Sequence, residues 1–111
     1  MQSVNYLHFL PEITQRIVSA SHPEKVILFG SYARGDHHPD SDIDLLVIMS
    51  HVDSPRAESN RLRRALRGLL VPVDVIVATT EQVDQYRNTV GFIYQTAMDE
   101  GKVIYDRSTA K

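Results

Sequence analysis

The sequence predicts an α/β domain built around one mixed sheet of three to four strands that is flanked by helices. Short apolar runs of strand length alternate along the chain with segments of helical periodicity. The most apolar of these runs, residues 42–49, has large apolar side chains on both faces. The length of 111 residues fits one domain, residues 1–111,. Strands that alternate with helices are typical of a sheet covered by helices.

The first half of the chain predicts one helix and two strands. Residues 11–20 carry apolar side chains at helical spacing, with a proline in the first turn, and predict a helix,. The run 25–29 predicts a buried strand that ends at Gly30,. A loop over residues 31–41 follows, rich in turn-forming Gly, Pro, Asp and Ser,. Residues 42–49 predict an interior strand, because both faces are apolar after two aspartates.

The second half predicts three helices and two strands. Residues 54–70 predict an amphipathic helix that begins with Ser-Pro and ends its apolar stripe at Leu69,. Residues 73–78 predict a third strand and residues 80–86 a short helix. A further helix is expected over residues 91–100, followed by a short strand of four residues after Gly101,.

The composition excludes several classes of protein. The chain has no cysteine, which excludes a disulfide framework, a thiolate nucleophile and a cysteine zinc site,. The net charge of −2 provides no general basic field, so direct DNA binding is not expected,. No apolar run approaches the roughly 20 residues of a membrane span. We therefore expect a cytoplasmic protein.

The start of the second strand carries two aspartates, Asp42 and Asp44. Residues two apart in a strand point to the same face, so their carboxylates are expected side by side. Two neighbouring carboxylates repel each other, and one would normally retain a proton. A divalent cation removes this conflict, and clustered carboxylate oxygens are ligands that Mg²⁺ prefers. The pair predicts a cation site.

The end of the first strand carries a turn that can receive phosphate. Gly30 permits close backbone approach, and Ser31 could begin a short helix with unpaired N–H groups,. A third acid, Asp74, stands near the start of the otherwise apolar third strand. If that strand lies beside the Asp42 strand, Asp74 could complete the cation site and act as a general base.

The residues Gly30-Ser31, the ten that follow, and Asp42-Ile43-Asp44 resemble the signature of the DNA polymerase beta nucleotidyltransferase superfamily. The fuller pattern, with Ala33-Arg34-Gly35-Asp36, is similar to the minimal nucleotidyltransferase (MNT) domains of prokaryotes. The resemblance implies a polymerase beta-like fold. It also implies that Gly30, Ser31 and Arg34 bind the nucleoside triphosphate, and that Asp42, Asp44 and Asp74 hold two Mg²⁺ ions, with Asp74 as the base.

The resemblance also implies a partner. MNT domains such as the MntA-like antitoxins are paired with all-helical HEPN toxins, and several are thought to silence the toxin by adenylylating a tyrosine. The residues after the third strand are too few for an acceptor domain, so we expect the acceptor to come from a partner protein or a homodimer. We expect transfer of AMP from ATP to a hydroxyl of a HEPN-type toxin. A non-catalytic antitoxin that acts by binding alone, or a nucleotidyltransferase for a small molecule, are the alternatives.

Other polar residues have ordinary interpretations. His37 and His38 are expected to be a solvent-exposed loop pair rather than metal ligands. The arginines of the second helix are expected to form a solvated face, with a docking surface as the alternative. These arginines are Arg56, Arg61, Arg63, Arg64 and Arg67.

Overall fold

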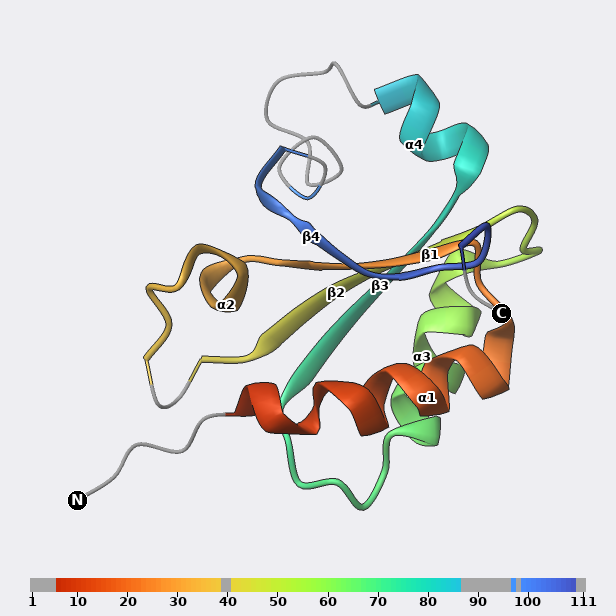
Figure 1. The fold of residues 1–111 in the computed structure, drawn as a ribbon. Coiled ribbons are helices and arrows are strands. Elements are labelled where there is room, and N and C mark those ends of the chain that lie inside the picture. The colour runs from red at the N-terminus through yellow and green to blue at the C-terminus, as the bar shows by residue number, and fades with distance from the viewer. Residues whose placement is uncertain (1–5, 39–40, 87–96, 98, 110–111) are drawn as a thin grey trace.

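The computed structural model describes residues 6–38, 41–86, 97 and 99–109, and shows a four-stranded sheet with helices on both faces (Figure 1). The predicted α/β architecture is confirmed. The described elements, in chain order, are η1 (Tyr6–Phe9), α1 (Leu10–Ser21), β1 (Lys25–Phe29), α2 (Ser31–Arg34), β2 (Ile43–Met49), α3 (Pro55–Ala65), β3 (Val73–Thr79), α4 (Thr80–Tyr86) and β4 (Lys102–Asp106).

The strand order of the sheet is β3-β2-β1-β4. Strand β1 is antiparallel to both β2 and β4, whereas β3 runs parallel to β2 after the crossover through α3. The sheet is therefore mixed, as predicted, and β2 is an interior strand. In the described part of the chain β3 pairs with β2 alone, so its other edge is open.

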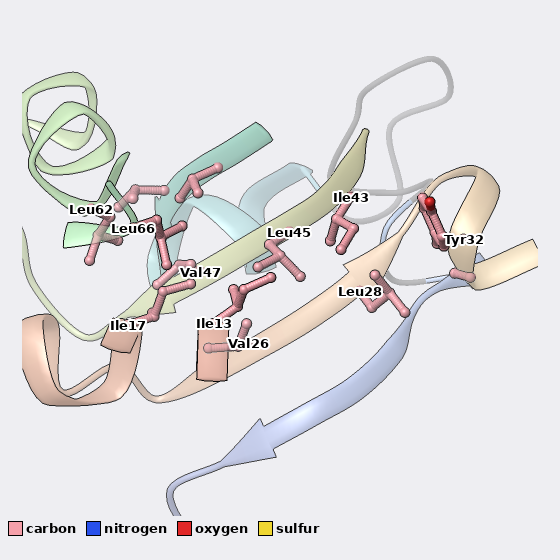
Figure 2. Packing of buried hydrophobic residues seen from close by; sticks show 13 residues of the cluster. Ile13, Ile17, Val26, Leu28, Tyr32, Ile43, Leu45, Val47, Leu62 and Leu66 are labelled. Atoms are coloured by element: carbon pink, nitrogen blue, oxygen red, sulfur yellow. The ribbon is translucent and has the colours of Figure 1, made fainter. Parts of the chain in front are cut away.

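Alternate residues of the strands pack on opposite faces of the sheet. On one face, apolar residues of β1, β2 and β3 pack against Ile13 and Ile17 of α1 and Leu62 and Leu66 from α3 and the turn after it (Figure 2). Strand residues of this face include Val26, Leu28, Ile43, Leu45, Val47, Val75 and Val77. The opposite face packs Ile27, Phe29, Leu46, Ile48 and Ala78 against Val83 of α4 and Ala97.

Helix α3 begins where the sequence predicts but ends earlier. The Ser54 side chain accepts a hydrogen bond of 3.2 Å from the N–H of Ala57, which satisfies a free donor at the helix start,. The helix was expected to continue to Leu70 but ends at Ala65. Gly68, with φ +94°, follows, and the backbone of Leu70 also has a positive φ. A left-handed residue interrupts helical hydrogen bonding, which explains the earlier end.

The other described elements agree with the expectations to within about two residues, and the 3₁₀ helix η1 is an addition,. The predicted loop after Gly30 contains the four-residue helix α2. The helix expected over 91–100 falls mainly on positions outside the described residues. Among the helices that the structure describes, none combines the length and apolar character that crossing a membrane requires.

Candidate active site

The two strands that carry the predicted acids lie side by side. Strands β2 and β3 pair in a register that places Asp44 opposite Asp74. Register partners in neighbouring strands project from the same face of a sheet, about 5 Å apart. Their neighbours Leu45 and Val75 belong to the core beneath α1 and α3, so the two acids project from the opposite face,. Asp42 is exposed and directly precedes β2.

The turn after β1 brings its backbone against the Asp44 carboxylate. Phe29 is the register partner of Asp44 in the β1–β2 pair, and Gly30 comes next. Gly30 has φ +76° and ψ −156°, a conformation that is open to glycine and strained for other residues. A Cβ atom at this position would overlap Oδ2 of Asp44. Glycine is therefore required both by the backbone and by the space that the carboxylate occupies.

Helix α2 begins directly at this turn. The N–H groups of Ala33 and Arg34 both donate to the carbonyl of Gly30, at 3.1 Å. The preceding N–H groups, those of Ser31 and Tyr32, come before the first intrahelical donor and have no partner within the helix. The short helix that the sequence suggested is confirmed, and its first donors stand next to the turn that contacts Asp44. Phosphate binding by Gly30 and Ser31 stays a prediction.

The acids at this end of the sheet influence one another. Burial raises the pKa of the Asp44 carboxyl above its usual range, and the negative charges of Asp74 and Asp42 raise it further. The guanidinium of Arg34 acts in the opposite direction. Asp44 is thus a half-buried acid whose ionised form lacks sufficient positive charge around it. A bound cation would supply that charge.

The donor set suits a hard divalent cation. Carboxylate oxygens from Asp42, Asp44 and Asp74 are ligands that Mg²⁺ prefers. Because Gly30 has no Cβ, the Asp44 carboxylate can lie directly against the turn that is predicted to bind phosphate. Within the described residues, however, no three side chains of His, Cys, Asp or Glu stand close enough together to form a ready-made metal site. The register joins Asp44 to Asp74, and assembly of all three acids around one ion stays a prediction.

Arg34 lies at the edge of this site, held by two acids. Its Nε atom is 3.1 Å from Asp36 Oδ2, and its Nη1 atom is 3.4 Å from Glu100 Oε1. All three side chains are substantially exposed. Glu100, which follows α4 in the chain, was not among the predicted site residues, because nothing in the local pattern connects it to Arg34. The predicted role of Arg34 toward phosphate requires it to leave or share these partners.

Arg63 of α3 contacts the third acid. Its Nη2 atom donates to Asp74 Oδ1 at 2.8 Å and to the carbonyl of Val75 at 3.2 Å. The arginines of the second predicted helix were expected to form a solvated face. The Arg63 side chain is partly exposed, but it also pairs with Asp74. Arg63 lies eleven residues before Asp74, on the helix that leads into β3, and no helical or strand period in the sequence connects the two positions.

An aromatic stack joins helix α2 to His37, three residues after its end. The rings of Tyr32 and His37 are 4.0 Å apart between centroids, with an interplanar angle of 13°. Tyr32 is buried and His37 is half-buried, whereas His38 is exposed. The expectation of an exposed histidine pair is therefore wrong for His37, because the flat face of the imidazole covers a buried phenol ring.

The sequence matches a known family over most of its length. The model of the nucleotidyltransferase domain family matches residues 10–104. A protein of Methanocaldococcus jannaschii named "putative protein adenylyltransferase" is 30% identical over 84 residues, which cover 74% of this chain and 78% of that protein. A second protein of that name from the same organism is 39% identical over 44 residues, or 40% of this chain and 44% of that protein.

Solved structures share the fold. A crystal structure of a putative nucleotidyltransferase from Sulfolobus solfataricus is 25% identical, with a TM-score of 0.66 over 94% of this chain and 83% of that one. A toxin–antitoxin structure with AMP-PNP is 23% identical, with a TM-score of 0.53 over 86% and 72% of the two chains. A mutant of the MntA-HpeT toxin–antitoxin is 18% identical, with a TM-score of 0.56 over 93% and 74%. At these lower identities the likeness is one of fold.

Proposed function

The chain belongs to the nucleotidyltransferase domain family and is a nucleotidyltransferase; on that premise we propose that it transfers AMP from ATP to a hydroxyl, in the first place a tyrosine, of a HEPN-type toxin and so acts as its antitoxin. One observation carries the proposal most directly. Asp44 is in register with Asp74 and in contact with the Gly30 turn, so carboxylates suited to Mg²⁺ adjoin a turn suited to phosphate.

The residues have distinct roles in this reaction. The turn at Gly30 and Ser31 holds the triphosphate. Asp42 and Asp44 would hold two Mg²⁺ ions, and Asp74 would join one of them. The cation, when bound, neutralises charge on the triphosphate and on the leaving pyrophosphate. Asp74 accepts the proton of the acceptor hydroxyl. The acceptor oxygen forms a bond to the α-phosphorus, the bond from that phosphorus to the bridging oxygen breaks, and pyrophosphate leaves.

Two comparisons support a protein as the acceptor. The Methanocaldococcus jannaschii relative with 30% identity is named for the adenylylation of proteins. The fold also occurs in the toxin–antitoxin structures, one of them with AMP-PNP. These likenesses favour a toxin acceptor over a small molecule. The open edge of β3 beside Asp74 is compatible with an acceptor as large as a folded protein.

Labelled nucleotide tests the proposal. The chain is incubated with Mg²⁺, ATP labelled on the α-phosphate and a purified HEPN-type toxin, and the toxin is then analysed for covalent label and by peptide mass spectrometry. We expect AMP on a tyrosine of the toxin. If no nucleotide, including GTP, CTP and UTP, leaves label on the toxin, the proposed acceptor is wrong.

A double variant separates catalysis from binding. Asp42→Asn with Asp44→Asn keeps the size of both side chains and removes both charges. If AMP transfer is the antitoxin mechanism, this variant binds the toxin but no longer neutralises it in a growth assay. Full neutralisation by a variant that transfers no AMP would instead establish the alternative, an antitoxin that acts by binding alone.

A further inference from the structure

The contact between Arg63 and Asp74 crosses from one face of the sheet to the other. Helix α3 covers the face on which Leu62 and Val75 are buried. The Asp74 side chain projects from the opposite face, next to Asp44,. Arg63 therefore reaches past the open edge of β3, and on its way its Nη2 atom also donates to the carbonyl of Val75.

This contact occupies one of the two oxygens of Asp74. The guanidinium donates to Oδ1 at 2.8 Å, so it both neutralises the carboxylate and restricts its orientation. Asp42 and Asp44 have no such partner among the described hydrogen bonds and ion pairs, although Arg34 acts on Asp44 through its charge. The three acids also do not form a metal-binding group among the described residues. One of the three predicted ligands is thus already engaged by an arginine.

We propose that Arg63 is a positioning residue that holds Asp74 at the edge of the sheet, and that a divalent cation must share or displace the Arg63 hydrogen bond in order to recruit Asp74. This inference rests on the proposed function, because it assigns Asp74 to the cation site. Arg63 thereby lowers the affinity of the site for the cation that Asp74 joins. Asp42 and Asp44 remain available to bind the other cation.

The expected direction follows from charge and competition. Replacing Arg63 by alanine frees Oδ1 and removes a positive charge beside the site, and both changes favour cation binding. A pair in which both side chains are nearly half exposed, 47% for Arg63 and 46% for Asp74, contributes little to folding,. The melting temperature of the metal-free protein should therefore change little. A merely structural role for Arg63 predicts a lower melting temperature and no gain in cation affinity.

Binding of Mn²⁺ to the whole chain, without nucleotide and at constant ionic strength, tests the proposal. The measurement uses electron paramagnetic resonance of free Mn²⁺ and isothermal titration calorimetry. We expect Arg63→Ala to bind Mn²⁺ about two- to fivefold more tightly than the unmodified protein. Arg63→Lys should lie between them, because lysine keeps the charge but not the planar donor group.

Arg64→Ala is the matched control. It removes the same charge from the adjacent position of α3, and Arg64 has no described contact with the acids of the site. Its Mn²⁺ affinity should equal that of the unmodified protein. In an Asp74→Asn background, the gain from Arg63→Ala should disappear.

The outcomes distinguish this inference from the proposed function. Unchanged or weaker Mn²⁺ binding by Arg63→Ala, or an equal gain in Arg64→Ala, overturns the role of Arg63 while the cation site itself can stand. If Asp42→Asn with Asp44→Asn binds Mn²⁺ as tightly as the unmodified protein, these acids form no cation site. The proposed function then fails, and the inference fails with it.

Discussion

Two half-buried acids, Asp44 at the N-terminal end of β2 and Glu58 of α3 near its C-terminal end, are in opposite electrostatic situations. At the N-terminal end, Asp44 is surrounded by two further acids and by the backbone of Gly30. At the C-terminal end, Glu58 of α3 lies beside a groove of about 560 Å³ that is also lined by Met49. The Glu58 carboxylate accepts hydrogen bonds from Arg61 and from the hydroxyl of Ser21.

The pKa values of the Asp44 and Glu58 carboxyl groups are shifted in opposite directions. Hydrogen bonds from Arg61 hold the pKa of Glu58 below its usual range, and the Ser21 hydroxyl contributes in the same direction. Burial and like charges move the pKa of Asp44 in the other direction. Glu58 is an acid whose charge the fold itself satisfies, whereas the described neighbours of Asp44 include two further acids that disfavour its charge. Partial burial of an acid therefore does not by itself indicate a functional site, because Glu58 is also half-buried and its charge is satisfied within the fold,.

The largest expected difference between the two ends is in catalysis. Asp44→Asn should lower AMP transfer at least about 1,000-fold, since several kcal/mol of transition-state stabilisation depend on the bound cation. Glu58→Gln should leave the rate within about twofold. Initial rates with labelled ATP at saturating Mg²⁺ measure both. Equal losses in the two variants would mean that the ends of β2 do not differ in function.

Gly30 tests how closely the turn and Asp44 are joined. Gly30→Ala should lower the free energy of unfolding by about 1–3 kcal/mol, because the backbone is strained and the new Cβ meets the Asp44 carboxylate,. Gly68→Ala is the control. Gly68 also has a positive φ, of +94°, but a Cβ there would meet no atom within 4 Å. Urea unfolding should show the larger loss for Gly30→Ala; equal losses would show that the carboxylate contact has no energetic effect.

Stability should change in opposite directions at the two ends. Asp44→Asn relieves repulsion with Asp74 and Asp42, so the metal-free variant should melt at a higher temperature and lose its stabilisation by Mg²⁺-ATP. Glu58→Gln weakens charged hydrogen bonds to Arg61 and Ser21 and should cost about 1 kcal/mol. Calorimetry of the metal-free proteins measures both. A lower melting temperature for Asp44→Asn would identify Asp44 as a structural hydrogen-bond acceptor instead.

The smallest effect is a pH dependence of these differences. Because the folded pKa of Asp44 is raised, the folded state binds more protons than the unfolded state just above pH 3.8, and the stability from Asp44 falls as pH rises through that window,. The pKa of Glu58 is lowered, so its stabilisation is present above about pH 4.5 and is lost as pH falls below it,. As pH rises from 3 to 7, the free energy of unfolding of Asp44→Asn should therefore increasingly exceed that of the unmodified protein. The free energy of unfolding of Glu58→Gln should fall increasingly below it. A pH-independent difference would contradict the assigned cause.

Local patterns in the sequence were sufficient for the strands and for part of the site. The apolar runs that predict β1, β2 and β3 are short and continuous, and their bounds are correct to within one residue. The two-residue period of a strand predicts a common face for Asp42 and Asp44. Local patterns do not determine which strands are neighbours, and the parallel register of Asp44 with Asp74 shows that β3 lies beside β2.

Contacts between distant segments could not be predicted in the same way. Ser21 and Glu58 are 37 residues apart, and Arg34 and Glu100 are 66 apart, so no local period connects them. The end of α3 was predictable from Gly68, a residue type common just after a helix, but the apolar stripe through Leu69 favoured a longer helix. The stack of His37 on Tyr32 depends on how the loop folds back, which composition does not indicate.

The open flank of β3 has a consequence for the engineering of this domain. The flank adjoins a groove of about 350 Å³ whose rim includes Arg56, Ser59 and Asn60. These side chains belong to α3 and have no described contact with the Gly30 turn or with Asp44. If the acceptor binds along this flank, as the proposed function allows, a combinatorial library at these three positions would diversify its surroundings and leave Asp44 and the Gly30 turn unchanged. Selection for new protein targets can therefore begin there without redesign of the sheet.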